Sequence, residues 1–104
     1  MIHWPNAGPS DLRRYKAIKL LVSKHPYLLD FLFDPEKPEL KDSPLILKKR
    51  IRGLSSGEQV LLRIAIDLWS GSEDVKLAEF NLLDQQNFQN AFMALQSLRG
   101  TGLV

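Results

Sequence analysis

Few side chains in this chain could support catalysis or hold a metal ion. It has two histidines, His3 and His25, and no cysteine, so thiolate zinc sites and histidine pairs at helical spacing are absent. Ser23 precedes His25 by two residues, and residues two apart on a helix do not face each other. Asp30 and Asp34 could share a helix face, but they also fit as polar residues around an apolar run. We therefore expect a non-enzymatic protein with no metal and no cofactor.

The string Leu-Ser-Ser-Gly-Glu at residues 54–58 is a second candidate for chemistry. It resembles the signature loop of ABC-type ATPases, in which a similar string begins a helix and contacts nucleotide phosphate. The resemblance covers about five residues, and the chain has no G-x-x-x-x-G-K-S/T phosphate loop. Ser55 and Glu58 have the S-x-x-E spacing of a capping box, with Ser56 and Gln59 as a second register. We interpret the string as the start of a helix.

The helix that follows, at about residues 56–70, is expected to be the centre of the fold. On a helical wheel, apolar side chains occupy nearly all of its circumference. The polar residues form one narrow stripe: Gln59, Arg63, Asp67 and Ser70. A surface helix has an apolar arc of little more than 100°, so other helices should wrap this one, and Gly71 should end it with a positive φ. The sequence predicts an all-α fold, a compact orthogonal bundle of five or six helices around this central apolar helix.

Size and composition fit one domain. The chain has 104 residues, of which 44% are hydrophobic and 25% charged, as in ordinary globular proteins. We expect residues 1–104 to form a single helical domain, with an irregular lead-in at 1–9 and a Pro-rich loop at 34–43. No signal-peptide pattern and no apolar run of 18 residues are visible, and cysteine is absent. These features predict a cytoplasmic protein that does not contact membranes.

Four further helix boundaries can be read from caps and prolines. Ser10 is the expected N-cap of a first helix that Pro26 stops after His25. Residues 27–33 form a short apolar run, which we interpret as a two-turn helix, with a strand as the alternative. Ser43-Pro44 has the pattern of an N-cap followed by proline at the first helical position of a helix that Gly53 closes. Residues 75–80 are expected to be a short helix or an extended segment.

Positive charge is confined to the first half of the chain. Residues 1–52 hold eleven Lys and Arg against six Asp and Glu, a net charge of +5, whereas residues 53–104 hold three against six, a net charge of −3. The cations form a candidate basic surface: Arg13, Lys16, Lys19, Lys48, Lys49 and Arg50. They fit solvated helix faces and a helix C-terminus, where cations complement the dipole. They also fit a contact surface for phosphate or an acidic partner.

The last helix is expected to begin after an Asp84 cap and to run to about Arg99. Its predicted inner stripe has helical spacing: Phe88, Ala91, Phe92, Leu95 and Leu98. Its predicted outer side is a candidate amide face that is almost uncharged: Gln85, Gln86, Asn87, Gln89, Asn90 and Gln96. A neutral amide surface is easier to desolvate than a charged one, which suits a protein interface or a homodimer.

The last thirty residues or so resemble the helix-turn-helix part of winged-helix regulators. This resemblance implies that the amides of the last helix are presented to DNA, where Asn and Gln can pair with adenine edges. The chain departs from that family because it leaves no room for a wing. Its candidate recognition helix also has no Lys or Arg before Arg99, although phosphate contacts normally supply much of the affinity.

Two functions are therefore open. The first is a small cytosolic binding module that acts through protein–protein contacts, with a protein partner or a second copy of itself. The alternative is a helix-turn-helix-like protein that binds nucleic acid and uses the basic N-terminal half for phosphate contacts.

Overall fold

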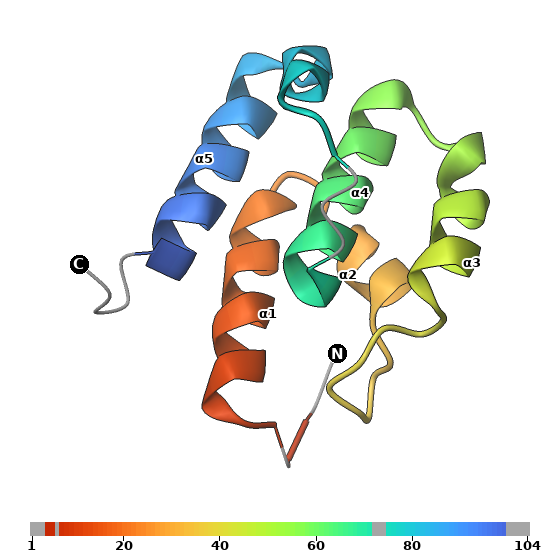
Figure 1. Ribbon diagram of the computed structural model, residues 1–104, viewed down its shortest axis with the longest axis vertical. Helices are drawn as coiled ribbons and strands as arrows, with labels where there is room; N and C mark the ends of the chain where they lie inside the picture. Colours follow the sequence, from red (N-terminus) through yellow and green to blue (C-terminus); the bar gives the residue numbers. More distant parts are fainter. Residues whose placement is uncertain (1–3, 6, 72–74, 100–104) are drawn as a thin grey trace.

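The chain folds around one apolar helix in a computed structural model that describes residues 4–5, 7–71 and 75–99 (Figure 1). In chain order its elements are α1 (Pro9–Leu21), α2 (Tyr27–Leu32), α3 (Pro44–Arg50), η1 (Ile51–Gly53), α4 (Ser56–Ser70), η2 (Leu77–Leu82) and α5 (Gln85–Arg99), where η marks a 3-10 helix. Within these described ranges β pairing is limited to an isolated bridge between Phe33 and Leu40. The predicted all-α bundle is confirmed.

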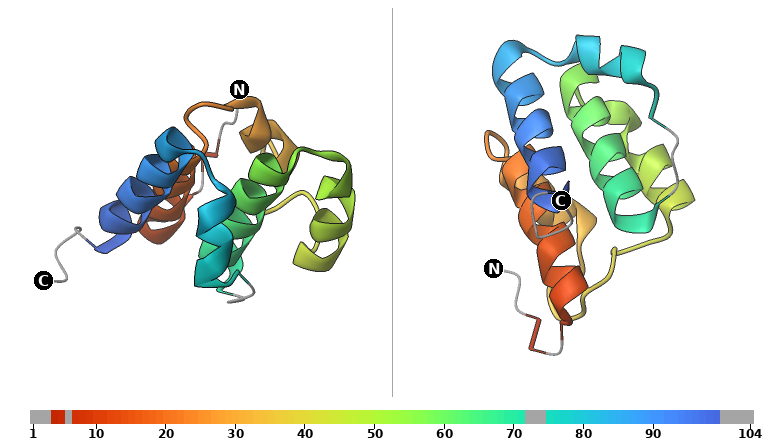
Figure 2. Two further views of the ribbon diagram at one scale, coloured as in Figure 1. Left: turned by 90° about the horizontal axis from the view of Figure 1, so that it is seen from above. Right: turned by 60° about the vertical axis from the view of Figure 1, so that its left-hand side comes forward.

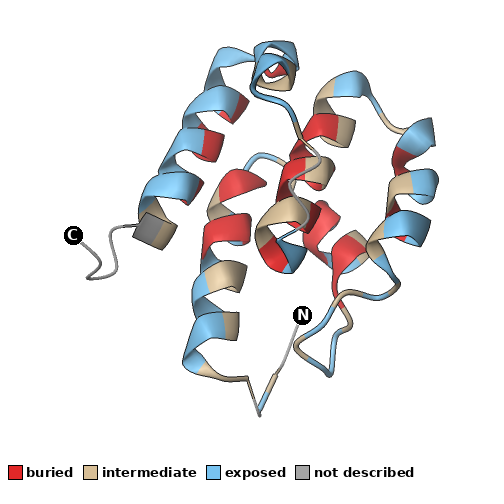
Figure 3. Ribbon diagram, in the orientation of Figure 1, coloured by how far each residue is buried: buried red, intermediate tan, exposed pale blue. Residues whose placement is uncertain are grey.

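Helix α4 is the predicted central helix. The Oγ of Ser55 accepts a hydrogen bond from the N–H of Glu58 at 3.2 Å, and the Glu58 carboxylate accepts one from the N–H of Ser55 at 3.3 Å. Gly71 ends the helix with a φ of 74°. Elements α1, α2, α3 and η2 all contact α4. Figure 3 shows buried segments along the length of this helix, and its buried side chains are Val60, Leu61, Leu62, Ile64, Ala65, Ile66 and Trp69.

The first helix differs from its prediction at both ends. It begins at Pro9 with Gly8 as N-cap, so the prediction of Ser10 as the cap is wrong. Proline favours the first helical position because its fixed φ already suits a helix and its missing N–H is not needed there. The helix also ends at Leu21, earlier than the predicted end at His25, and a turn leads from there to α2.

The other predicted boundaries fit the structure more closely. Residues 27–32 form α2, so the helical interpretation of this run is confirmed and the strand alternative is wrong. The Oγ of Ser43 accepts a hydrogen bond from the N–H of Ile46 at 3.4 Å and caps α3, and the Pro-rich loop lies between α2 and α3. The helix that Gly53 was expected to close changes at Ile51 into η1. The short element before α5 is the 3-10 helix η2.

Trp4 anchors the lead-in to the body of the molecule. Its indole Nε1 donates a hydrogen bond to the carbonyl oxygen of Asp34 at 2.8 Å. Its ring centroid lies 4.8 Å from that of Tyr15, 5.3 Å from that of Phe33 and 5.8 Å from that of Trp69. The segment before α1 therefore closes one end of the bundle by joining α1, α4 and the loop after α2.

Candidate protein-interaction surface

Helix α5 packs chiefly along α1, and both views of Figure 2 show the two helices side by side. Asp84 caps α5 as predicted: its Oδ1 accepts a hydrogen bond from the N–H of Asn87 at 2.8 Å. This hydrogen bond is the main cause that lowers the pKa of the Asp84 carboxyl below its ordinary value, and an ion pair with Lys24 at 3.3 Å adds to it. The cap and the contact with α1 fix both the start of α5 and its rotation about its own axis.

That rotation differs from the prediction. The buried side chains of α5 are Asn87, Asn90, Ala91 and Ala94, with Leu98 partly buried. The predicted inner stripe is correct for Ala91 and Leu98 and wrong for Phe88, Phe92 and Leu95, which are exposed. Alanine side chains allow the axes of two helices to approach closely, and α1 contributes the fully buried Ala17 to the same core. The small residues of α5 are therefore buried, and its aromatic residues are left outside.

The predicted amide face is correspondingly divided. All four of its glutamines are exposed: Gln85, Gln86, Gln89 and Gln96. Asn87 and Asn90 are only 5% and 6% exposed, so their placement on the solvent face is wrong. The Oδ1 of Asn90 accepts a hydrogen bond from Gln86 at 3.3 Å, but among the described residues its Nδ2 and the Oδ1 of Asn87 have no partner. Each such buried atom costs about 1–3 kcal/mol of folding free energy.

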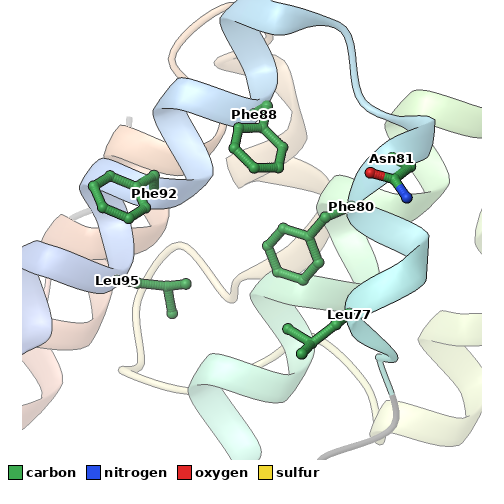
Figure 4. Close-up of a pocket in the computed structure, with 6 residues that line it drawn as sticks. All are labelled: Leu77, Phe80, Asn81, Phe88, Phe92 and Leu95. Carbon is green, nitrogen blue, oxygen red and sulfur yellow. The ribbon is translucent and has the colours of Figure 1, made fainter.

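Exposed apolar side chains of α5 line two adjoining hollows, one of which is shared with η2. A groove of about 340 Å³ lies between the two elements and is lined by Leu77, Phe80, Asn81, Phe88, Phe92 and Leu95 (Figure 4). A second hollow of about 440 Å³ shares two of these side chains and is lined by Phe88, Gln89, Phe92 and Met93. We call the apolar side chains of these two hollows the apolar face: Leu77, Phe80, Phe88, Phe92, Met93 and Leu95.

Element η2 is held in place on α4. The carboxylate of Glu79 accepts a hydrogen bond from the N–H of Lys76 at 2.8 Å and forms an ion pair with Arg63 of α4. The backbone hydrogen bond, with a smaller contribution from Arg63, lowers the pKa of the Glu79 carboxyl. The ring of Phe80 then lies edge-on to that of Phe88, with centroids 6.4 Å apart. The groove walls thus come from two anchored elements.

The lining of the apolar face is mostly apolar. Asn81 and Gln89 are the polar residues in the lining of the two hollows, and neither side chain titrates. Sequence reasoning missed this surface because α5 has two stripes with helical spacing. A signal that could have shown it is the pair of alanines at i and i+3, which marks a close helix–helix contact on the other side of the helix.

The structure does not gather the predicted basic residues into one surface. Arg13, Lys16 and Lys19 are exposed on α1, whereas the other three belong to α3, and α4 lies between these helices (Figures 1 and 2). On α3, Lys48 forms an ion pair with Asp67 at 3.4 Å, Arg50 pairs with Asp42, and Lys49 is exposed. The candidate basic surface is therefore two separate patches.

The titratable residues that the sequence offered as candidates for catalysis or metal binding take part in caps, loop hydrogen bonds and ring contacts. Glu58 serves the cap of α4, and the hydroxyl of Tyr27 donates a hydrogen bond to it that is the main cause of its lowered pKa. Asp34 accepts hydrogen bonds from two backbone N–H groups of its loop, which lower its pKa. His25 lies beside the ring of Tyr27, with centroids 5.9 Å apart, and His3 lies outside the described residues.

Across the described ranges, no three histidine or acidic side chains are grouped so that they could hold a metal ion. None of the described helices has the length and apolar character needed to cross a membrane. Comparison of the chain with protein-family models, with curated proteins and with solved structures gave no match.

Proposed function

We propose that this protein is a binding module that acts through protein–protein contact, and that the apolar face is its contact surface. The observation that carries the proposal is the orientation of α5. This helix leaves two phenylalanines, a methionine and a leucine in water while it buries two asparagines with unpartnered atoms. Exposed apolar side chains are unfavourable for an isolated chain, and a second protein that covers them removes that part of the cost.

The size of the surface supports the same conclusion. The exposed fractions are 86% for Leu77, 44% for Phe88, 55% for Phe92, 49% for Met93 and 37% for Leu95. At about 200 Å² for a fully exposed large apolar side chain, these five expose on the order of 500 Å². Burial at about 25 cal/mol per Å² would then contribute on the order of 10 kcal/mol before the costs of association.

The shape of the surface favours a macromolecule over a small ligand. Small-molecule sites enclose most of the ligand surface, whereas this groove is open, since Leu77 and Phe92 in its lining are 86% and 55% exposed. Apolar and aromatic side chains between polar ones are typical of the core and rim of a protein interface. Here Gln85, Gln89 and Gln96 lie between Phe92 and Met93 on the helical wheel, and Gln86 lies beyond Met93.

Nucleic-acid binding has less support from the arrangement of charges. The cations lie in two patches on either side of α4, and the exposed side of α5 presents aromatic side chains between its glutamines. A titration with generic DNA or RNA at low salt tests this alternative. Binding that weakens steeply with salt and is lost in Lys49→Glu would favour it.

Site-specific photo-crosslinking in the cells that naturally express the protein tests the proposal. A photoreactive phenylalanine analogue replaces Phe92 in one variant and Leu45 in the control. Leu45 lies on α3 and is 67% exposed, so it matches Phe92 as an exposed apolar side chain away from the apolar face. We expect a discrete protein adduct at position 92 and none at position 45. No adduct at 92, or equal adducts at both positions, would contradict the proposal.

A further inference from the structure

We infer that the apolar face binds a second copy of this chain, with α5 of one protomer lying antiparallel to α5 of the other across a twofold axis. This inference rests on the proposed function and names its partner. Two independent properties of the apolar face support it, namely the absence of charge along α5 and the amount of exposed apolar area.

The first property is the absence of charge. No residue from Gln85 to Leu98 is charged, in a chain in which 25% of residues are. Near a twofold axis each side chain meets its own copy, so a charged residue there would face a like charge. Glutamine avoids this repulsion because it carries no charge, and its amide can both donate and accept hydrogen bonds.

Three glutamines lie on the exposed side of α5 beside Phe92. At 100° per residue, Gln85, Gln89 and Gln96 project within about 60° of Phe92, on the exposed side of α5. The apolar residues Phe88 and Leu95 lie on the other side of Phe92, toward η2. Two copies of this face can therefore bury their aromatic residues in each other's grooves, with the neutral amides, which lie between Phe92 and Met93, facing the partner helix.

Two of the acidic side chains beside the apolar face are paired within one protomer. Glu79 forms an ion pair with Arg63, and Asp84 pairs with Lys24. A basic or acidic amphipathic helix from another protein would find little opposite charge at this surface with which to pair. A second copy needs none, which is why the charge pattern favours self-association over a charged partner.

The second property is area. A standard protein interface buries about 800 Å² on each partner, of which somewhat more than half is apolar. The apolar face offers on the order of 500 Å² of exposed apolar surface, close to the apolar share of such an interface. Exposed glutamine side chains can supply much of the polar remainder. The apolar face is thus large enough for a stable dimer.

Sedimentation equilibrium of the full chain tests the inference. We expect wild type to approach twice the chain mass of 11.9 kDa as concentration rises. Phe92→Glu places like charges at the axis in a side chain that is already half exposed, so it should fold normally and raise the dimer Kd at least about thirtyfold. The matched control Leu45→Glu should dimerise as wild type does. A wild type that stays monomeric at every concentration overturns the inference.

A disulfide test gives a positive result that does not depend on Phe92→Glu being soluble. The chain has no cysteine, so a single introduced thiol can form a disulfide only with a second copy. Met93→Cys lies beside the middle of α5 and should cross-link rapidly on mild oxidation, whereas Leu45→Cys on α3 should not. Equal rates for both variants, or no cross-link for Met93→Cys, would overturn the antiparallel twofold arrangement.

The photo-crosslinking experiment separates failure of this inference from failure of the proposed function. An adduct at position 92 with twice the chain mass supports the dimer. An adduct with a different protein, together with a monomeric chain in sedimentation, overturns the dimer and leaves the binding module standing. Absence of any adduct overturns both.

Discussion

Replacing Asn90 with leucine tests whether α5 is packed on α1 through its amides. Asn90 is 6% exposed, its Nδ2 has no partner, and its Oδ1 accepts one hydrogen bond from Gln86. Leucine has the same branched shape as asparagine and no polar atom. The substitution therefore removes an unsatisfied donor, worth about 1–3 kcal/mol, and loses a hydrogen bond worth about 0.5–1.5 kcal/mol. Leucine also favours a helix over asparagine by roughly 0.5 kcal/mol.

The net expectation is that Asn90→Leu stabilises the fold by about 1–2 kcal/mol. In a domain of this size each kcal/mol raises Tm by about 4–8 °C. Urea and thermal unfolding, followed by far-UV circular dichroism, measure the change. Both should be done in the Phe92→Glu background, because self-association would make Tm depend on concentration.

The matched control is Gln89→Leu, one position away on the exposed side of α5. It should change the free energy of unfolding by less than about 0.5 kcal/mol. If Asn90→Leu instead lowers Tm by several degrees while Gln89→Leu does not, the amide of Asn90 has a partner that stabilises the fold. If the leucine at position 89 is the stabilising one, α5 buries a different face. Either result would refute the reasoning about the rotation of α5, on which the apolar face depends.

Three further predictions concern the rest of the fold. Ile64→Asp places an unpaired charge on the buried side of α4 at a cost of several kcal/mol, so it should abolish the cooperative unfolding transition, whereas Leu45→Asp at an exposed position should keep it. A folded Ile64→Asp variant with unchanged Tm would contradict the assignment of Ile64 to the core. The guanidinium of Arg14 donates hydrogen bonds to the carbonyl oxygen of Trp69 at 2.6 Å and to Asp11 at 2.8 Å, and it lies 4.4 Å from the Trp69 ring centroid. Lysine cannot make both hydrogen bonds from one planar group, so Arg14→Lys should lower the free energy of unfolding in urea by about 1–3 kcal/mol, whereas Arg13→Lys at the exposed neighbour should change it little. Equal effects of the two substitutions would argue against this role of the guanidinium. The folded-state pKa values of the Asp34, Glu58, Glu79 and Asp84 carboxyls are lowered, so these groups stabilise the fold above their unfolded pKa values, and this stabilisation is lost as pH falls through the lowered values. Tm should therefore drop as pH falls below about 4.5, and Asp84→Asn should flatten the drop while keeping the cap. A Tm that rises on acidification would show the sign to be wrong.

The boundaries of the central helix follow from the sequence because the interactions that set them are local. The Ser55–Glu58 box joins residues three apart, and Gly71 is chosen for a φ that other residues avoid. The apolar circumference of the same helix indicates, without any structure, that others surround it. The Ser43 cap of α3 and the Asp84 cap of α5 are equally short-range, and both are confirmed. The sequence therefore predicts the all-α architecture and most of the positions at which helices begin.

Which face of α5 is buried was decided only by tertiary structure. The stripe of Phe88, Phe92 and Leu95 and the stripe of Asn87, Ala91 and Ala94 both repeat at helical spacing, so periodicity by itself cannot choose between them. The choice depends on how closely α1 can approach, and that is a property of two helices about sixty residues apart in sequence. The same holds for the separation of the basic residues, which share a half of the chain but lie on either side of α4. Local hydrogen bonds fix where a helix begins, whereas the rotation of that helix depends on the side chains of its neighbours.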